Sequence, residues 1–151
     1  MKRLLGLLML VLLSTTVPGY VGAQTSSPRI AQLKKKAAAG DANAQTSLGL
    51  SYAYGEGVPE DKAEAVKWYR LAAAQGEATA QMSLGNAYEY GEGVPEDYIQ
   101  AYKWYNLAAA SGSPVVANEA KNAKDRLAKT MTKQQIAEAQ KLSTAFKPTT
   151  P

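Results

Sequence analysis

The chain contains no cysteine and no histidine. It can therefore form no disulfide, and it lacks both the commonest metal ligand and the commonest general base near neutral pH. It also has no Ser-x-x-Lys string, the motif that opens the active site of serine β-lactamases and penicillin-binding proteins. We therefore predict no catalytic residue, no metal site and no bound cofactor, and we expect that the protein is not an enzyme.

Long apolar runs are scarce, and the one that stands out lies near the N-terminus. Two basic residues precede an apolar run over residues 4–13, and small residues follow at 21–23. This pattern predicts a signal peptide over residues 1–23 that is cleaved before Gln24, with a flexible leader over residues 24–28. The run is too short to favour a membrane anchor. We expect a periplasmic or secreted protein with no stable membrane insertion after cleavage.

A strong excess of one charge is also lacking. Loss of two basic residues with the signal peptide leaves 15 Lys and Arg against 13 Asp and Glu, a net charge of +2. A near-neutral chain argues against nucleic acid as the partner, because nucleic-acid binding needs a concentrated basic face. The charges are nevertheless unevenly spread: residues 24–40 carry +4, residues 41–115 carry −6 and residues 116–151 carry +4.

An internal repeat occupies the middle of the chain. Residues 44–79 and residues 80–115 are identical at 23 of 36 aligned positions, and both contain the strings GEGVPED and LAAA. Repeats of this length are typical of stacked supersecondary units, each too small to bury its apolar face alone.

The spacing inside one copy predicts helix, loop and helix. Apolar residues recur at steps of four over residues 44–52, and the Gly- and Pro-rich segment 55–59 then breaks the helix. Asp61, with Glu64 three positions later, is typical of a helix start. A second helical face follows around Trp68.

One glycine lies inside the first helix of each copy, at Gly49 and Gly85. Because glycine in a helix costs about 1 kcal/mol relative to alanine, we predict that it permits close approach of a neighbouring helix, with the alanines 72–74 as the facing surface. We expect large rings to fill the remaining core: Tyr52, Trp68, Tyr88 and Trp104.

These residues resemble the Sel-one-like repeat (SLR), a relative of the tetratricopeptide repeat (TPR) with a longer loop between its helices. The matching positions, each with a partner 36 residues later, are Leu48, Gly49, Tyr52, Gly55, Gly57, Val58, Asp61, Ala65, Trp68, Tyr69, Ala72, Ala73 and Gly76. The resemblance implies an all-α fold, a TPR-like right-handed α/α solenoid.

The predicted solenoid domain covers residues 29–146. Its parts are a half-repeat cap at 29–43 with a helix over 29–39, repeats at 44–79 and 80–115, and C-terminal capping helices at 116–146, the last of them opened by Thr132 and Gln135. Residues 147–151 are expected to form a disordered tail.

Paired acids recur in the two loops, at Glu60-Asp61 and Glu96-Asp97. We interpret these carboxylates as helix caps rather than as catalytic pairs, because they directly precede helix starts.

The candidate partner-binding residues lie on the first helix of each repeat, which in the resembled families lines a concave binding face. They are Ser47, Leu50, Ser51 and Tyr54, with Ser83, Asn86, Ala87 and Tyr90 as equivalents. Tyr54 and Tyr90 could instead cover the neighbouring repeat. We expect a scaffold, adaptor or regulator that binds a protein or peptide. The alternative is a cell-wall-associated protein that binds peptidoglycan or hydrolyses β-lactams or amides.

Overall fold

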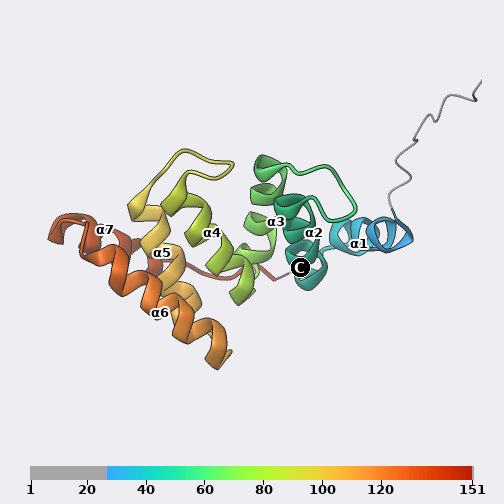
Figure 1. Cartoon of the computed structure of the whole chain (residues 1–151). Coiled ribbons are helices and arrows are strands. Elements are labelled where there is room, and N and C mark those ends of the chain that lie inside the picture. The colour runs from blue at the N-terminus through green and yellow to red at the C-terminus, as the bar shows by residue number, and fades with distance from the viewer. Residues whose placement is uncertain (1–26, 151) are drawn as a thin grey trace, which may run out of the picture.

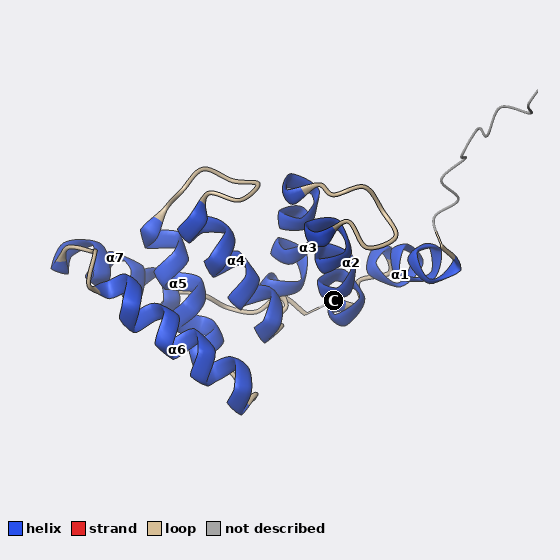
Figure 2. Cartoon of the chain, in the orientation of Figure 1, coloured by secondary structure: helices blue, strands red, loops and turns tan. Residues whose placement is uncertain are grey.

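The structure, a computed structural model, describes residues 27–150. These residues form seven helices and no strand (Figure 2). The helices are α1 (Pro28–Ala38), α2 (Ala42–Tyr54), α3 (Lys62–Ala74), α4 (Ala78–Tyr90), α5 (Tyr98–Ala109), α6 (Pro114–Ala128) and α7 (Lys133–Thr144). The predicted all-α solenoid is confirmed. The expected signal peptide lies outside the described residues.

From α1 to α6, consecutive helices pack as neighbours along the stack (Figure 1). The pairs α2–α3 and α4–α5 are the two helical hairpins, which α1 precedes and α6 follows. We call α2, α4 and α6 the first helices, and α1, α3 and α5 the second helices. The last helix, α7, packs on α5.

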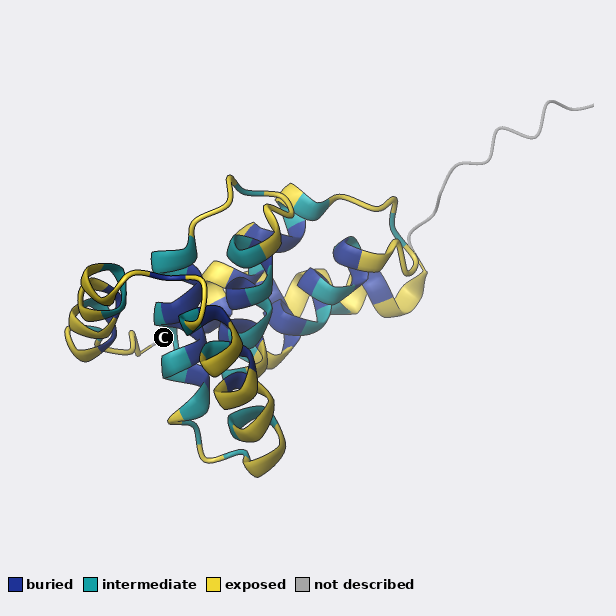
Figure 3. Cartoon of the chain, turned by 60° about the vertical axis from the view of Figure 1, so that its left-hand side comes forward, coloured by how far each residue is buried: buried dark blue, intermediate teal, exposed yellow. Residues whose placement is uncertain are grey.

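Each first helix of a hairpin ends in a left-handed glycine, and each second helix begins at an aspartate. Gly55 (φ 69°) and Gly91 (φ 65°) end α2 and α4, where a residue without a Cβ atom adopts positive φ at no steric cost. Asp61 accepts a hydrogen bond from the Glu64 amide at 2.9 Å, and Asp97 makes the equivalent bond in the second hairpin. The predicted caps are confirmed. The intervening loops, 55–61 and 91–97, lie on the same edge of the molecule (Figure 1) and are largely exposed (Figure 3).

Close approach at the two mid-helix glycines is confirmed, but the facing surface is aromatic. A Cβ atom on Gly49 would lie 2.5 Å from Cε1 of Tyr69, and one on Gly85 would overlap the Tyr105 ring. The prediction that alanines 72–74 face these glycines is therefore wrong. The missing methyl group makes room for a tyrosine ring of the partner helix in the same hairpin.

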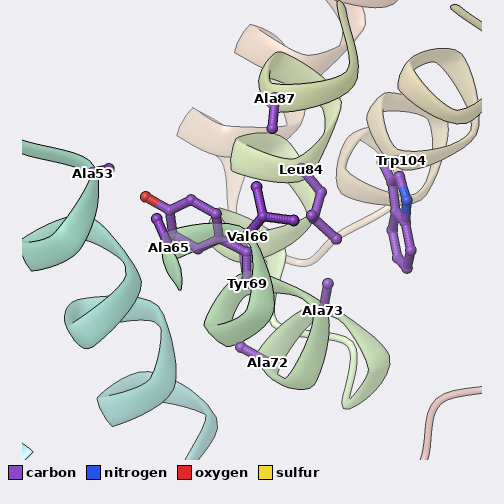
Figure 4. Packing of buried hydrophobic residues seen from close by; sticks show 10 residues of the cluster. Ala53, Ala65, Val66, Tyr69, Ala72, Ala73, Leu84, Ala87 and Trp104 are labelled. Carbon is purple, nitrogen blue, oxygen red and sulfur yellow. The ribbon is translucent and has the colours of Figure 1, made fainter. Parts of the chain in front are cut away.

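The core lies along the contacts between helices. In the central cluster, Tyr69 of α3 points toward α2, and Leu84 of α4 lies between Val66 and Trp104 (Figure 4). Trp104 is only 8% exposed, whereas its equivalent Trp68 is half-buried at the edge of a smaller cluster between α1 and α2. The two tryptophans therefore differ in burial, although their repeats are closely similar.

The C-terminal segment after α7 is ordered as far as Thr150. Thr132 and Gln135 form a complete capping box at the start of α7, as predicted. The chain then runs back across α5 and α3 (Figure 1), where the Phe146 ring packs edge-on against Trp104 at 5.7 Å. The Thr149 amide donates to the Ala74 carbonyl oxygen at 2.8 Å. The expectation of a disordered tail is wrong for residues 147–150, because these contacts hold them on the second helices.

Candidate partner-binding face

The first helices α2, α4 and α6 border one face of the solenoid, which we call the first-helix face. Tyr54 and Tyr90 are the last residues of α2 and α4, and their side chains are 67% and 59% exposed. Each ring is held by a cation from a neighbouring element. The Lys62 ammonium lies 5.3 Å from the centre of the Tyr54 ring, and the Arg126 guanidinium donates to the Tyr90 hydroxyl at 3.2 Å. Both rings are therefore positioned on the surface rather than buried against the adjacent repeat.

A narrow cavity of about 70 Å³ lies between α2 and α4. Five of the predicted residues line it: Leu50, Tyr54, Ser83, Asn86 and Ala87. Tyr69 also lines the cavity, and burial raises the pKa of its hydroxyl to about 12. The hydroxyl is therefore protonated at neutral pH, and the cavity lining includes a neutral hydrogen-bonding group.

A wider, open groove of about 510 Å³ lies between α4 and α6. Asn86 and Tyr90 are the predicted residues that line it, and Glu92 borders both this groove and the cavity. The other lining residues were missed by sequence reasoning: Met82, Glu119, Asn122, Ala123 and Arg126. No repeat signal could have identified those on α6, because that helix departs from the repeated pattern.

A polar network centred on Glu89 joins α4, α5 and α6 at this groove. The Arg126 guanidinium donates to both carboxylate oxygens of Glu89, at 2.9 and 3.1 Å, while the Glu89 side chain is only 10% exposed. The Tyr105 hydroxyl oxygen lies 2.5 Å from a carboxylate oxygen of Glu89 and 2.7 Å from the side-chain oxygen of Asn86, and its single hydrogen is shared between these two acceptors. Burial, followed by the bond to Glu89, raises the pKa of Tyr105 above its ordinary value, so this hydroxyl remains a donor. The network fixes the geometry of the wide groove.

Two predicted residues are not available to a partner. Ser51 is 2% exposed, and its hydroxyl donates to the Ser47 carbonyl oxygen. The prediction for Ser51 is wrong because α2 is covered by α1 and α3, which leaves little of its surface free. Ala87 is also buried and contributes only to the wall of the cavity. A third predicted residue, Ser47, is half-buried and lines neither the cavity nor the groove.

The loop aspartates Asp61 and Asp97 stabilise the helices that they cap, α3 and α5. Replacing Asp61 or Asp97 by alanine removes the acceptor of one helix-end amide and should cost about 0.5–2 kcal/mol in each case. Chemical denaturation of the two variants would measure this loss. Asp125, which is exposed, lies in the last turn of α6 and caps no helix start, so it offers a control. Equal losses for Asp125→Ala and Asp61→Ala would show that the cap contributes nothing specific.

Comparison with known proteins identifies the repeat. The Sel1 (Sel-one-like) repeat family matches residues 42–77 and residues 78–113. The chain is a Sel1 repeat protein. Each matched segment begins at the first residue of a first helix, α2 or α4, and so contains one complete hairpin. Repeats of this family typically mediate protein–protein interaction, and their structural relatives are generally non-catalytic scaffolds.

Two solved structures are similar to this Sel1 repeat protein. One is c5321, a protective antigen of uropathogenic Escherichia coli strains with an SLR fold, at 34% identity, a TM-score of 0.73 and 78% of this chain covered. The other is a Sel1 repeat protein from Oxalobacter formigenes, at 38% identity, a TM-score of 0.57 and 62% coverage. The chain spans about a quarter of each, 24% and 27% respectively. No curated protein matches the sequence. Among residues 27–150, no helix is both long and apolar enough to cross a membrane.

Proposed function

We propose that this Sel1 repeat protein is an exported, non-catalytic scaffold that holds a partner protein or peptide on its first-helix face. The observation that carries the proposal is that the cavity between α2 and α4 and the groove between α4 and α6 adjoin and share lining residues. Asn86 and Glu92 border both depressions, and an exposed tyrosine borders each of them. An extended segment could therefore contact all three first helices.

The chemistry of this face suits recognition of a polypeptide. Tyrosine provides a large contact area at a small cost in side-chain entropy. The side-chain oxygen Oδ1 of Asn86 lies within hydrogen-bond distance of the Tyr105 hydroxyl, so the side-chain nitrogen of Asn86 can donate to a partner's main-chain carbonyl group. Because the Glu89 network fixes α6 relative to α4, little ordering of this groove is needed on binding.

The test is partner capture followed by an affinity measurement. The mature protein would be crosslinked in the periplasm, the captured protein identified and purified, and its Kd measured against wild type and the Tyr54→Ala/Tyr90→Ala variant. We expect the double variant to bind at least about tenfold more weakly, a loss of about 1.4 kcal/mol. Its melting temperature should stay close to that of wild type, because both rings are exposed.

A matched control comes from outside the cavity and the groove. Val115 is an exposed apolar residue of α6 that lines neither of them, so Val115→Ala removes apolar surface without touching either. Partner affinity should be unchanged in this variant. If Val115→Ala weakened binding as much as the tyrosine pair, the cavity and the groove would not be the binding surface.

The non-catalytic part of the proposal has its own test. Wild type and an Asp61→Ala/Asp97→Ala variant would be assayed for turnover of β-lactams and peptidoglycan fragments. We expect background rates for both, because the two carboxylates cap helices. Turnover by wild type that disappears in the folded double variant would make these acids catalytic and contradict the scaffold proposal.

Export is tested by the N-terminus of the protein recovered from the periplasm or medium. N-terminal sequencing should begin at Gln24 or within a few residues of it, because residues 21–23 provide a small-residue cleavage site after the apolar run. A chain that keeps Met1 and sediments with membranes would contradict the proposed location.

A further inference from the structure

The C-terminal tail shows how the second helices hold an extended segment. The Phe146 ring packs on Trp104. Leu107 and Phe146 both pack against the central cluster of buried residues. Three residues later, the Thr149 amide donates to the carbonyl oxygen of Ala74, the last residue of α3. Carbonyl groups at the end of a helix have no partner within the helix, so an extended chain can supply the missing donor. We call this binding site of the tail, formed by Trp104, Leu107 and the Ala74 carbonyl oxygen, its seat. It combines an aromatic contact with one main-chain hydrogen bond.

The residues equivalent to those of this seat lie 36 residues earlier, on α1 and α3. Trp68 and Leu71 of α3 correspond to Trp104 and Leu107, and the carbonyl oxygen of Ala38 corresponds to that of Ala74. Within residues 27–150, however, no tail covers this second seat. Leu71 is 51% exposed whereas Leu107 is half-buried, and Trp68 is half-buried whereas Trp104 is buried. The Ala38 carbonyl oxygen accepts no hydrogen bond from any described residue.

The surface beside this second seat is basic. Helix α1 carries four basic residues and no acid. Lys35 and Lys36 are exposed, and neither forms an ion pair with another residue of the described chain. A second copy of the tail, which carries Lys147, would bring like charge to this helix. The second seat therefore favours an acidic segment over the protein's own C-terminus.

We propose that the second seat, on the surface formed by α1 and α3, is a second docking site, for an extended acidic segment of a partner protein that carries an aromatic residue. The aromatic ring packs on Trp68 and Leu71, and the main-chain amide three residues later donates to the Ala38 carbonyl oxygen. Acidic side chains of the segment lie beside the lysines of α1. This site is separate from the first-helix face, so it stands or falls independently of the proposed function.

A synthetic peptide derived from the tail provides the probe. Its sequence is that of residues 144–151 with the Lys147→Glu change, labelled with a fluorophore at its N-terminus. Fluorescence anisotropy with the full chain should show saturable binding that weakens as salt is added. The same peptide with Phe146→Ala should bind at least about tenfold more weakly, because it lacks the ring.

Variants of the protein locate the peptide. Leu71→Glu should weaken binding at least about tenfold through lost apolar contact and added negative charge, while its circular dichroism and melting temperature stay close to wild type. The Tyr54→Ala/Tyr90→Ala variant should bind the peptide with unchanged affinity. An absence of saturable binding would overturn the proposal, as would binding that Leu71→Glu does not affect.

The tail's own seat is the competing location. If the peptide displaced the natural tail, a Phe146→Ala change in the protein would tighten binding and Leu71→Glu would have no effect. That result would place the peptide between α3 and α5 and overturn its assignment to the second seat. Binding lost only in the Tyr54→Ala/Tyr90→Ala variant would also overturn it and would place the peptide on the first-helix face.

Discussion

Trp104→Ala should lower the free energy of unfolding by about 3–5 kcal/mol, the usual cost of deleting a buried tryptophan ring. Trp104 is 8% exposed and shares the central cluster with Leu84 and Ala73, and the Phe146 ring lies 5.7 Å from its ring in a T-shaped arrangement. A loss of this size is a large share of the about 5–15 kcal/mol by which a domain is stable. Urea denaturation followed by circular dichroism would measure it.

Trp68→Ala is the matched control, because it deletes the same side chain at the equivalent position of the first repeat. Trp68 is half-buried, so part of its ring already contacts water, and the loss should be smaller by at least about 1 kcal/mol. The Phe146→Ala variant completes the comparison. A double-mutant cycle with Trp104→Ala should give a coupling energy of about 0.5–1.5 kcal/mol. Equal losses at Trp68 and Trp104, with no coupling to Phe146, would contradict the described packing of the tail.

The helical hairpins could be predicted from sequence because their signals are local and repeated. Each loop carries its breaking glycines and its capping aspartate within a few residues, and two copies of the same string confirm each other. The course of the tail could not be predicted in this way. Phe146 contacts a ring 42 residues earlier (146 minus 104), and no short-range pattern specifies that contact.

Part of the candidate binding face could also be predicted, because helical spacing is a local signal that both repeats share. Helical spacing placed Tyr54 and Tyr90 on one side of their helices, and the structure shows both exposed there. Spacing alone could not show that Ser51 is buried, because that depends on how closely α1 and α3 cover α2. Arg126 was missed because it occupies the position that corresponds to Tyr90 one repeat earlier, where the pattern gives no reason to expect a cation.

Gly85→Val should destabilise the protein by about 2–3 kcal/mol through overpacking. Even a Cβ atom at this position would overlap the Tyr105 ring. The ring cannot turn away easily, because it is fully buried and its hydroxyl is held by Asn86 and Glu89. The added side chain must therefore separate α4 from α5, which weakens the network that fixes the wide groove on the first-helix face.

Gly112→Val provides the control for the glycine substitution itself. A Cβ atom on Gly112 would meet no atom within 4 Å, and its backbone does not adopt positive φ. This change should alter the free energy of unfolding by no more than about 0.5 kcal/mol, as is usual for an unobstructed surface position. Thermal melts of both variants would separate the two cases. If Gly85→Val melted at the wild-type temperature, the close contact between α4 and Tyr105 would not exist, and the reason for a glycine inside each first helix would have to be sought elsewhere.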